Sequence, residues 1–234
     1  MKHAILLLTV LTVFQISVFA KDDDKSETRK LDGFNSVSVA AGIDLYLQMG
    51  DNYEINVVAD DDIIDYIVTE VKGKKLDIYM KKRGFGNRDR FRGSRKVYIT
   101  LPELRRLQAS SGSDVYSENT LEAETLELKG SSSSDMSLVV ACKNLSIEGS
   151  SSSDIKIIGV AKNCKIEASS ACDIKARDLE CEICRIDASS ASDVVVTVIK
   201  ELYAQASSAS DIIVYGDPQI KEIKESSAGS IRQR

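Results

Sequence analysis

One short phrase recurs through the second half of the sequence and constrains the fold more than any other feature. It reads Ala/Gly-Ser-Ser-x-Ser/Cys-Asp, and its copies end on Asp114, Asp135, Asp154, Asp173, Asp193 and Asp211. A seventh, degenerate copy spans residues 225–230. Successive aspartates are 18 to 21 residues apart. A period near 19 is typical of a solenoid, in which each repeat forms one turn of a rod.

Alignment of the copies on their aspartate predicts which positions each turn buries. Apolar residues stand nine and seven positions before it and one and three after it; for Asp154 these are Leu145, Ile147, Ile155 and Ile157. Spacing of two, with polar residues between, is strand periodicity. We therefore predict an all-β protein, a parallel β-solenoid of about seven coils with the apolar columns inside. The alternative is a sandwich of antiparallel hairpins, which would need turn pairs such as Asn-Gly at regular intervals.

The first part of the chain is less regular and is predicted to cap the rod. We assign residues 31–105 to a β-rich cap and residues 106–234 to the solenoid. Within the cap, residues 37–48, 53–59, 76–80 and 96–101 read as strands, and residues 60–71 as a short helix. The phrase from Ala40 to Tyr46 echoes the repeat, so it is a candidate for a diverged coil.

The N-terminus has the features of a secretory signal peptide. A basic start precedes an apolar run, and Val18-Phe19-Ala20 supplies small residues at a cleavage site, so residues 1–20 are predicted to be removed. Residues 21–30 are highly charged and are predicted to be a disordered leader. An extracytoplasmic location follows, whether secreted, periplasmic or at the cell surface, with no membrane span after cleavage.

Composition removes several classes of function. The only histidine is His3, inside the predicted signal peptide, so the mature chain would hold no imidazole for a Ser-His-Asp triad or a metal site. A net charge of -5 disfavours nucleic acid as a partner. The chain has no Trp, which weakens a carbohydrate-stacking platform, although eight Tyr remain.

Two stretches carry a family resemblance. They are residues 97–115, which include Val97-Tyr-Ile-Thr-Leu-Pro-Glu-Leu104, and residues 34–45, which include Gly42-Ile-Asp-Leu45. The chain resembles, from about Leu31 to Arg234, a bacterial family labelled "putative autotransporter adhesin, head GIN domain". The resemblance implies an all-β, repeat-built extracytoplasmic protein and brings no catalytic residues with it. It also suggests a long translocation barrel, which this sequence does not contain.

The aspartates of the repeat form the most regular chemical feature. Stacked in register, Asp114, Asp135, Asp154, Asp173, Asp193 and Asp211 would stand about 4.8 Å apart and repel one another. One interpretation is structural: aspartates and serines accept hydrogen bonds at a corner of each coil. The other is a row of cations, with Ca²⁺ favoured by oxygen ligands. We favour the structural interpretation because the Gly-rich nonapeptide of calcium-binding β-rolls is absent. Catalysis is disfavoured because these residues are the repeat itself.

A basic segment is the second candidate site. Residues 81–96 hold eight cations against one aspartate, with Phe85 and Phe91 between them: Lys81, Lys82, Arg83, Arg88, Arg90, Arg92, Arg95 and Lys96. Three glycines indicate a loop between two strands. Such a segment suits contact with an anionic polymer, although a solvated loop that pairs with the acidic body has the same composition.

The five cysteines predict one disulfide. Cys164 and Cys184 occupy a column that leucine fills in other coils, so they read as core residues in adjacent turns, close enough for a bridge. Cys181 and Cys184 have C-x-x-C spacing, but strand alternation would send them to opposite faces, and zinc is not expected.

These observations predict a non-enzymatic surface protein for adhesion or ligand binding. The basic segment is the expected contact, and a cell-surface glycan, an anionic polymer or a protein the expected partner. No cofactor is predicted, calcium being the one considered. The alternatives are an enzyme acting on polysaccharide, since β-solenoids carry such sites, and a structural protein of the cell envelope.

Overall fold

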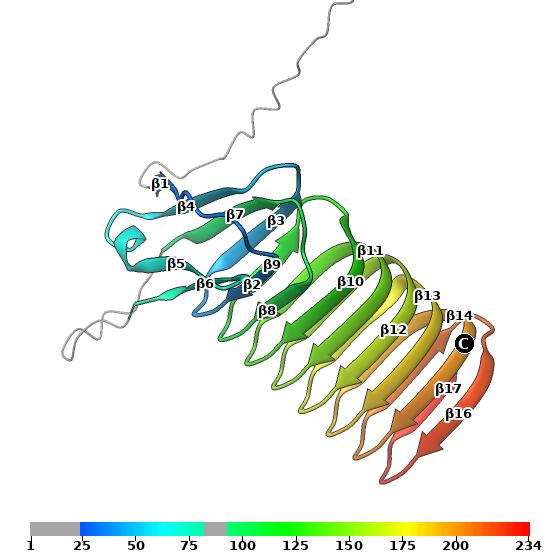
Figure 1. The fold of residues 1–234 in the computed structure, drawn as a ribbon. Helices are drawn as coiled ribbons and strands as arrows, with labels where there is room; N and C mark the ends of the chain where they lie inside the picture. Colours follow the sequence, from blue (N-terminus) through cyan, green and yellow to red (C-terminus); the bar gives the residue numbers. More distant parts are fainter. Residues whose placement is uncertain (1–23, 82–92) are drawn as a thin grey trace, which may run out of the picture.

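The computed structural model describes residues 24–81 and 93–234, which form a rod built from β-strands (Figure 1). The predicted fold is confirmed: the chain is all-β and winds into a parallel β-solenoid of about seven turns. The hairpin alternative is wrong for the repeat region, where successive coils pair in parallel. Within the described residues, no helix has the length and apolarity needed to cross a membrane.

Each long strand begins at a repeat aspartate, bends around the rod, and ends at the Ala or Gly before the serines. The solenoid strands are β8 (Arg106–Ala109), β9 (Asp114–Ser117), β10 (Leu121–Gly130), β11 (Asp135–Gly149), β12 (Asp154–Ala168), β13 (Asp173–Ala188), β14 (Asp193–Ala206), β15 (Asp211–Tyr215), β16 (Gln219–Glu225) and β17 (Ser230–Gln233). The aspartates lie in register from coil to coil. The predicted inner columns are buried; Ile155 is 0% and Ile174 1% exposed.

The cap continues the solenoid but follows a different chain order. Its parallel strands are β2 (Ser36–Val39), β3 (Asp44–Met49), β6 (Lys75–Met80) and β7 (Arg95–Leu101). Strand β2 pairs with both β6 and β8, and β3 with both β7 and β9. The coil made by β2 and β3 therefore lies between two coils that follow it in sequence, and Ala40 to Tyr46 is indeed part of a coil.

Antiparallel strands cover the N-terminal end of the rod. They are β4 (Glu54–Asp60) on β7, β1 (Asp24–Thr28) on β4, and β5 (Ile67–Lys72) on β6. The expectation of a disordered leader through residue 30 is wrong for residues 24–28, because their backbone satisfies the free edge of β4. Residues 1–20, the predicted signal peptide, lie outside the described residues.

The predicted helix over residues 60–71 is also wrong. Only Ile64–Tyr66 forms a single 3-10 turn, and Ile67–Lys72 is strand β5. Ile63 and Ile64 are buried, and the alternating Ile67-Val-Thr-Glu-Val71 sequence favours a strand once β6 offers it a partner.

Candidate binding face

The serine just before each repeat aspartate ties one coil to the previous one. Ser134, Ser153, Ser192 and Ser210 are 0 to 2% exposed. Each hydroxyl donates to a carbonyl one coil back; Ser210 Oγ lies 2.8 Å from the Ala188 carbonyl oxygen and accepts from the Ser207 N–H. We call this turn the serine corner. The buried hydroxyls of the serine corner therefore have a structural role, as the sequence predicted for the serines of the repeat.

The two residues at the tip of the corner have left-handed backbone conformations. In the coil that ends at Asp193, Ser190 has φ 55° and Ala191 φ 57°. A non-glycine residue in this region is strained, and bulky side chains are disfavoured there. This geometry explains why every copy has small residues at both positions. Hydrogen bonds between neighbouring coils satisfy the backbone of the corner; for example, the Ala191 N–H donates to the Ser208 carbonyl at 3.0 Å.

The aspartates form a solvent-facing row beside the serine corner. Asp44 joins the row, because Leu45 is in register with Val115 and the Asp44 charge acts on Asp114. Burial raises the pKa of Asp44, and burial and neighbouring carboxylates raise the pKa of Asp114, Asp135 and Asp193. The expected mutual repulsion therefore operates along the row.

Lysine and arginine side chains of the protein compensate part of that repulsion. Lys175 Nζ lies 2.6 Å from Asp154 and 3.9 Å from Asp173, and the Asp154 carboxylate raises the pKa of Lys175. Arg232 pairs with Asp211 at 3.4 Å. In the part of the chain that the structure describes, no three Asp, Glu, Cys or His groups are arranged to hold a metal ion. The chain's own cations thus neutralise part of the charge at Asp154, Asp173 and Asp211, and a row of Ca²⁺ ions stays an untested alternative.

Five of the eight cations of the predicted basic segment fall within residues 82–92, which the structure does not describe. Lys82, Arg83, Arg88, Arg90 and Arg92 lie outside the described residues. The remaining cations stand at the two ends of the segment: Lys81, Arg95 and Lys96.

The described end of this segment meets the aspartate row. Lys96 is in register with Asp44, and the charges of Lys96 and Arg95 both act on that carboxyl. Arg95 packs against the chain and donates from Nη1 to the Ala41 carbonyl at 3.3 Å. Arg95 is therefore committed to the fold, unlike the free cation that a binding loop requires.

The disulfide joins Cys164 to Cys181, so the predicted partner Cys184 is wrong. The two Cα atoms are 6.1 Å apart, and Cys184 is a free, buried thiol whose pKa burial raises to about 12. Cys181 and Cys184 both point inward, because the strand bends between them at two half-exposed residues and strand alternation is interrupted.

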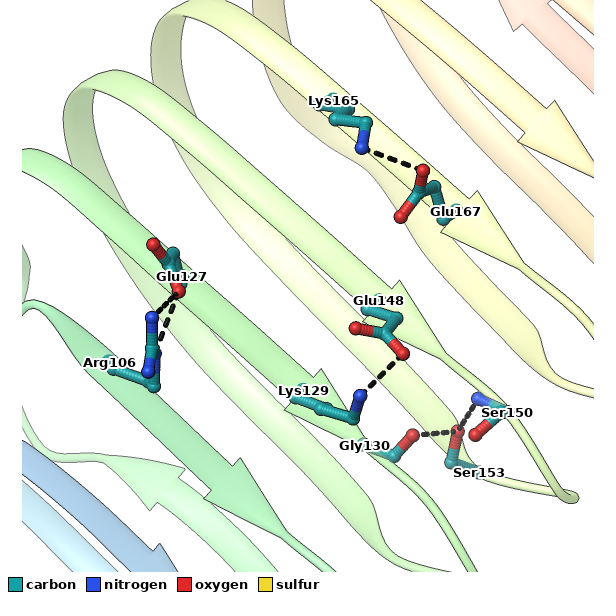
Figure 2. Close-up of polar contacts among 9 residues, drawn as sticks. All are labelled: Arg106, Glu127, Lys129, Gly130, Glu148, Ser150, Ser153, Lys165 and Glu167. Carbon is teal, nitrogen blue, oxygen red and sulfur yellow. Dashed lines mark hydrogen bonds and ion pairs between the residues drawn. The ribbon is translucent and has the colours of Figure 1, made fainter.

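The outward residues of the strands that lead into the serine corner form a second, highly charged surface. We call it the ladder face; it consists of the exposed side chains of β8, β10, the later halves of β11 to β14, and β16. Figure 2 shows three of its ion pairs: Arg106 with Glu127 at 2.5 Å, Lys129 with Glu148 at 2.6 Å, and Lys165 with Glu167 at 2.7 Å. The first two pairs bridge neighbouring coils. Farther along the face like charges also stand opposite each other, Lys165 with Arg185 and Glu167 with Asp187.

A row of hollows lies along the ladder face, and neighbouring hollows share lining residues; we call this row the trough. The largest, about 690 Å³, lies between the cap and the first coils and is lined by the cations Lys72, Lys74, Lys75, Arg105 and Arg106 and by the acids Glu103, Glu124 and Glu127. A hollow of about 240 Å³ shares Arg106 and Glu127 with it, and one of about 440 Å³ shares Glu127 and Ser146 with the second. A fourth, of about 160 Å³, shares Lys165, Arg185 and Tyr203 with the third. The trough thus runs from the cap to β16.

The trough offers both donors and acceptors. Asn163 donates to Asn144 of the preceding coil at 2.9 Å. The Arg185 guanidinium lies over the Tyr203 ring, 4.6 Å from its centroid. Among the described residues, no carboxylate lies within ion-pair distance of Lys74, although its charge acts on Glu103 in the largest hollow.

Three tyrosines stack on the face that carries the aspartate row. Tyr46 lies between Tyr98, with centroids 4.8 Å apart, and Tyr116, with centroids 5.3 Å apart. Their ring faces cover one another along the rod axis. The stack therefore stabilises the register of three coils and does not form a platform for a flat ligand.

Sequence reasoning missed the trough. The residues that line it lie one period apart. The columns eight and six residues before each aspartate are rich in charged residues, among them Arg106, Glu127, Lys129 and Glu148, and this signal could have indicated the face. Asp44 could have been found as well, since its phrase echoes the repeat.

The comparisons with known proteins agree with this architecture. A putative adhesin from Bacteroides fragilis is similar over 92% of this chain and 98% of its own, with a TM-score of 0.84 and 19% identity. A putative lipid binding protein from Parabacteroides distasonis has a TM-score of 0.73 and 20% identity over the same shares. A putative adhesin from Parabacteroides merdae has a TM-score of 0.71 and 14% identity, also over 92% and 98%. At these identities the likeness establishes the fold.

Among curated proteins, none matches the chain. A family model does match, over residues 33–218, and its description is "Putative auto-transporter adhesin, head GIN domain". The match covers most of the sequence and both the cap and the solenoid. The chain therefore belongs to the auto-transporter adhesin head GIN domain family.

Proposed function

We propose that this protein is a non-enzymatic, extracytoplasmic adhesin that holds an extended polysaccharide carrying acidic groups in the trough of the ladder face. The observation that carries the proposal is the row of neighbouring hollows that makes up the trough. Four hollows share lining residues from the cap to β16, which suits a long polymer better than a compact substrate.

The chemistry of the lining supports an acidic glycan. Five cations face three acids in the largest hollow, where Arg105 and the Lys74 charge lower the pKa of the Glu103 carboxyl. Asn144, Asn163 and Tyr203 supply donors and acceptors for hydroxyl groups farther along. The family description, with its adhesin label, and the predicted signal peptide favour a surface location.

The test is retention of the chain on immobilised heparin and polygalacturonate, with neutral dextran as the reference. We expect the double variant Lys165→Glu, Arg185→Glu to elute at clearly lower salt than wild type, because both cations line the middle of the trough. The matched control Lys156→Glu, Lys200→Glu carries the same charge change at residues that do not line the trough, since Lys200 pairs with Glu182, and it should lose much less.

Two further arms separate the other candidates. The variant Arg88→Ser, Arg90→Ser, Arg92→Ser tests the basic segment and leaves Arg95 in place, since Arg95 supports the fold. Vesicles with anionic headgroups test the lipid binding named for one structural neighbour. Equal salt elution of the trough variant and its control, with unchanged melts, would place binding elsewhere.

A further inference from the structure

The two ends of the rod are finished differently (Figure 1). At the N-terminal end, β1, β4 and β5 cover the outermost coil with antiparallel strands. At the other end, the last described strands are β16, whose ladder partner is β14, and β17, whose ladder partner is β15. Along β17 one backbone donor already has a partner within the chain, because the Ile231 N–H donates to the Glu225 carboxylate at 2.6 Å. Strand β16 is the edge that can accept another strand.

The inner column of the solenoid is uncovered at β16. Ile220 and Ile223 are in register with Leu202 and Ala204 of the preceding coil. Those two residues are 1% and 3% exposed, whereas Ile220 is 48% and Ile223 43% exposed. Both isoleucines occupy core positions, and among the described residues no further coil covers them.

The charges of β16 fit a second copy of the same strand. In an antiparallel pair related by a two-fold axis, one residue faces itself, and its neighbours face each other in reverse order. Centred on Ile223, this arrangement sets Glu222 opposite the partner's Lys224 and Lys224 opposite the partner's Glu222. Centred on Glu222 or on Lys224, it sets like charges against each other, which is destabilising.

Cross-strand pairs of opposite charge also occur inside the chain. Glu222 and Lys224 lie at the end of the ladder face, where they line the last hollow of the trough. Earlier on that face, Lys129 stands opposite Glu148 and Arg106 opposite Glu127 across strand boundaries. A strand centred on Ile223 adds two pairs of this kind at the end of the rod, on a face where like charges also stand opposite each other, as Lys165 and Arg185 do.

We propose that β16 is a self-association surface, through which two copies of this chain join end to end as a two-fold symmetric dimer. The antiparallel β16 strands form the contact, Ile223 covers Ile223 of the partner subunit, and the Glu222 and Lys224 pairs fix the register. In the dimer, the largest hollow of each copy, which lies next to the cap, is directed toward an opposite end of a longer rod. This inference does not depend on what the trough binds.

The test is the self-association constant of residues 21–234, measured by sedimentation equilibrium. We expect a dimer for wild type, and about a tenfold or larger rise in dissociation constant for Glu222→Lys and for Lys224→Glu, since each turns two attractive pairs into two repulsive ones. The double variant E222K/K224E should dimerise like wild type, and the two single variants should combine with each other when mixed. Lys143→Glu, far from β16, is the matched control.

A crosslink tests the register separately. Ile223→Cys should form an intermolecular disulfide under mild oxidation, because a residue at the two-fold axis faces its own copy within bridging distance. Ile220→Cys, equally exposed but opposite Ser226 of the partner, should crosslink much less. A monomeric wild type, a dimer indifferent to both charge reversals, or a folded E222K/K224E that fails to recover would each overturn the proposal.

Discussion

The hydroxyl of Ser153 lies 3.4 Å from the Sγ atom of Cys172, its counterpart in the next coil. Both side chains are buried at the serine corner, and Ser153 also donates to the Gly130 carbonyl at 3.2 Å and accepts from the Ser150 N–H at 3.1 Å (Figure 2). A thiol therefore fills one copy of a position that hydroxyls fill elsewhere. The interior of the corner is a packed column, and its polar contacts connect coils.

Removing one of these hydroxyls should weaken the rod. For Ser153→Ala we expect a loss of about 1 kcal/mol, since the Gly130 carbonyl loses a buried donor. For a chain of this size that loss lowers the melting temperature by about 2–4 °C. Ser152→Ala is the control, because Ser152 is exposed at the tip, where Ala191 stands in another coil. Identical melts for the two variants would contradict the role assigned to the buried hydroxyl.

The inward assignment of the apolar columns predicts a much larger effect. Ile155→Asp buries an unpaired charge at a position that is 0% exposed, so we expect the variant to unfold or to melt far below wild type. Lys156→Asp, on the adjacent exposed residue, should melt close to wild type. Circular dichroism of both variants checks this, and a cooperative, wild-type melt of the isoleucine variant would refute the register.

The aspartate row predicts a pH-dependent stability. Burial, then the Asp114 and Asp154 charges, raise the pKa of Asp135. A raised folded-state pKa contributes stability below the ordinary value of the carboxyl, and this contribution is lost as pH rises through the folded-state pKa. Asp135→Asn should therefore melt about 1–3 °C higher than wild type at neutral pH, with the gain gone below the ordinary aspartate pKa.

The control for this experiment is Asp178→Asn, an exposed carboxylate outside the row. It should follow the wild-type melting curve across the same pH range. A gain for Asp135→Asn that persists in acid would have to come from something other than removal of the ionised carboxylate.

The disulfide predicts a defined peptide map. Digestion without reduction should yield a disulfide-linked pair of peptides that contain Cys164 and Cys181. The same linked pair should be recovered from Cys184→Ser. Cys181→Ser should cost about 3 kcal/mol, as expected for a loop of this length. Recovery of a Cys164 to Cys184 link from wild type would show that the bridge follows the ladder register instead.

The sequence alone determined the period, the strand columns and the corner. These features repeat every turn, and each depends on local chemistry: alternation of apolar residues sends Ile155 and Ile174 inward, and small residues fit the tight corner at Ser190 and Ala191. Any coil could be predicted from any other coil.

Only the tertiary structure decided what joins one coil to another. The bend between Cys181 and Cys184 turns Cys181 inward, although strand alternation predicted that these two cysteines face opposite sides. Pairing of β1 with β4 orders residues that look disordered in isolation. The trough, the added member Asp44 of the aspartate row, and the open edge at β16 all involve residues that meet across strand boundaries. Such contacts depend on register and chain order, which a single sequence does not state, because the same strand can pair on either side until its neighbours are placed.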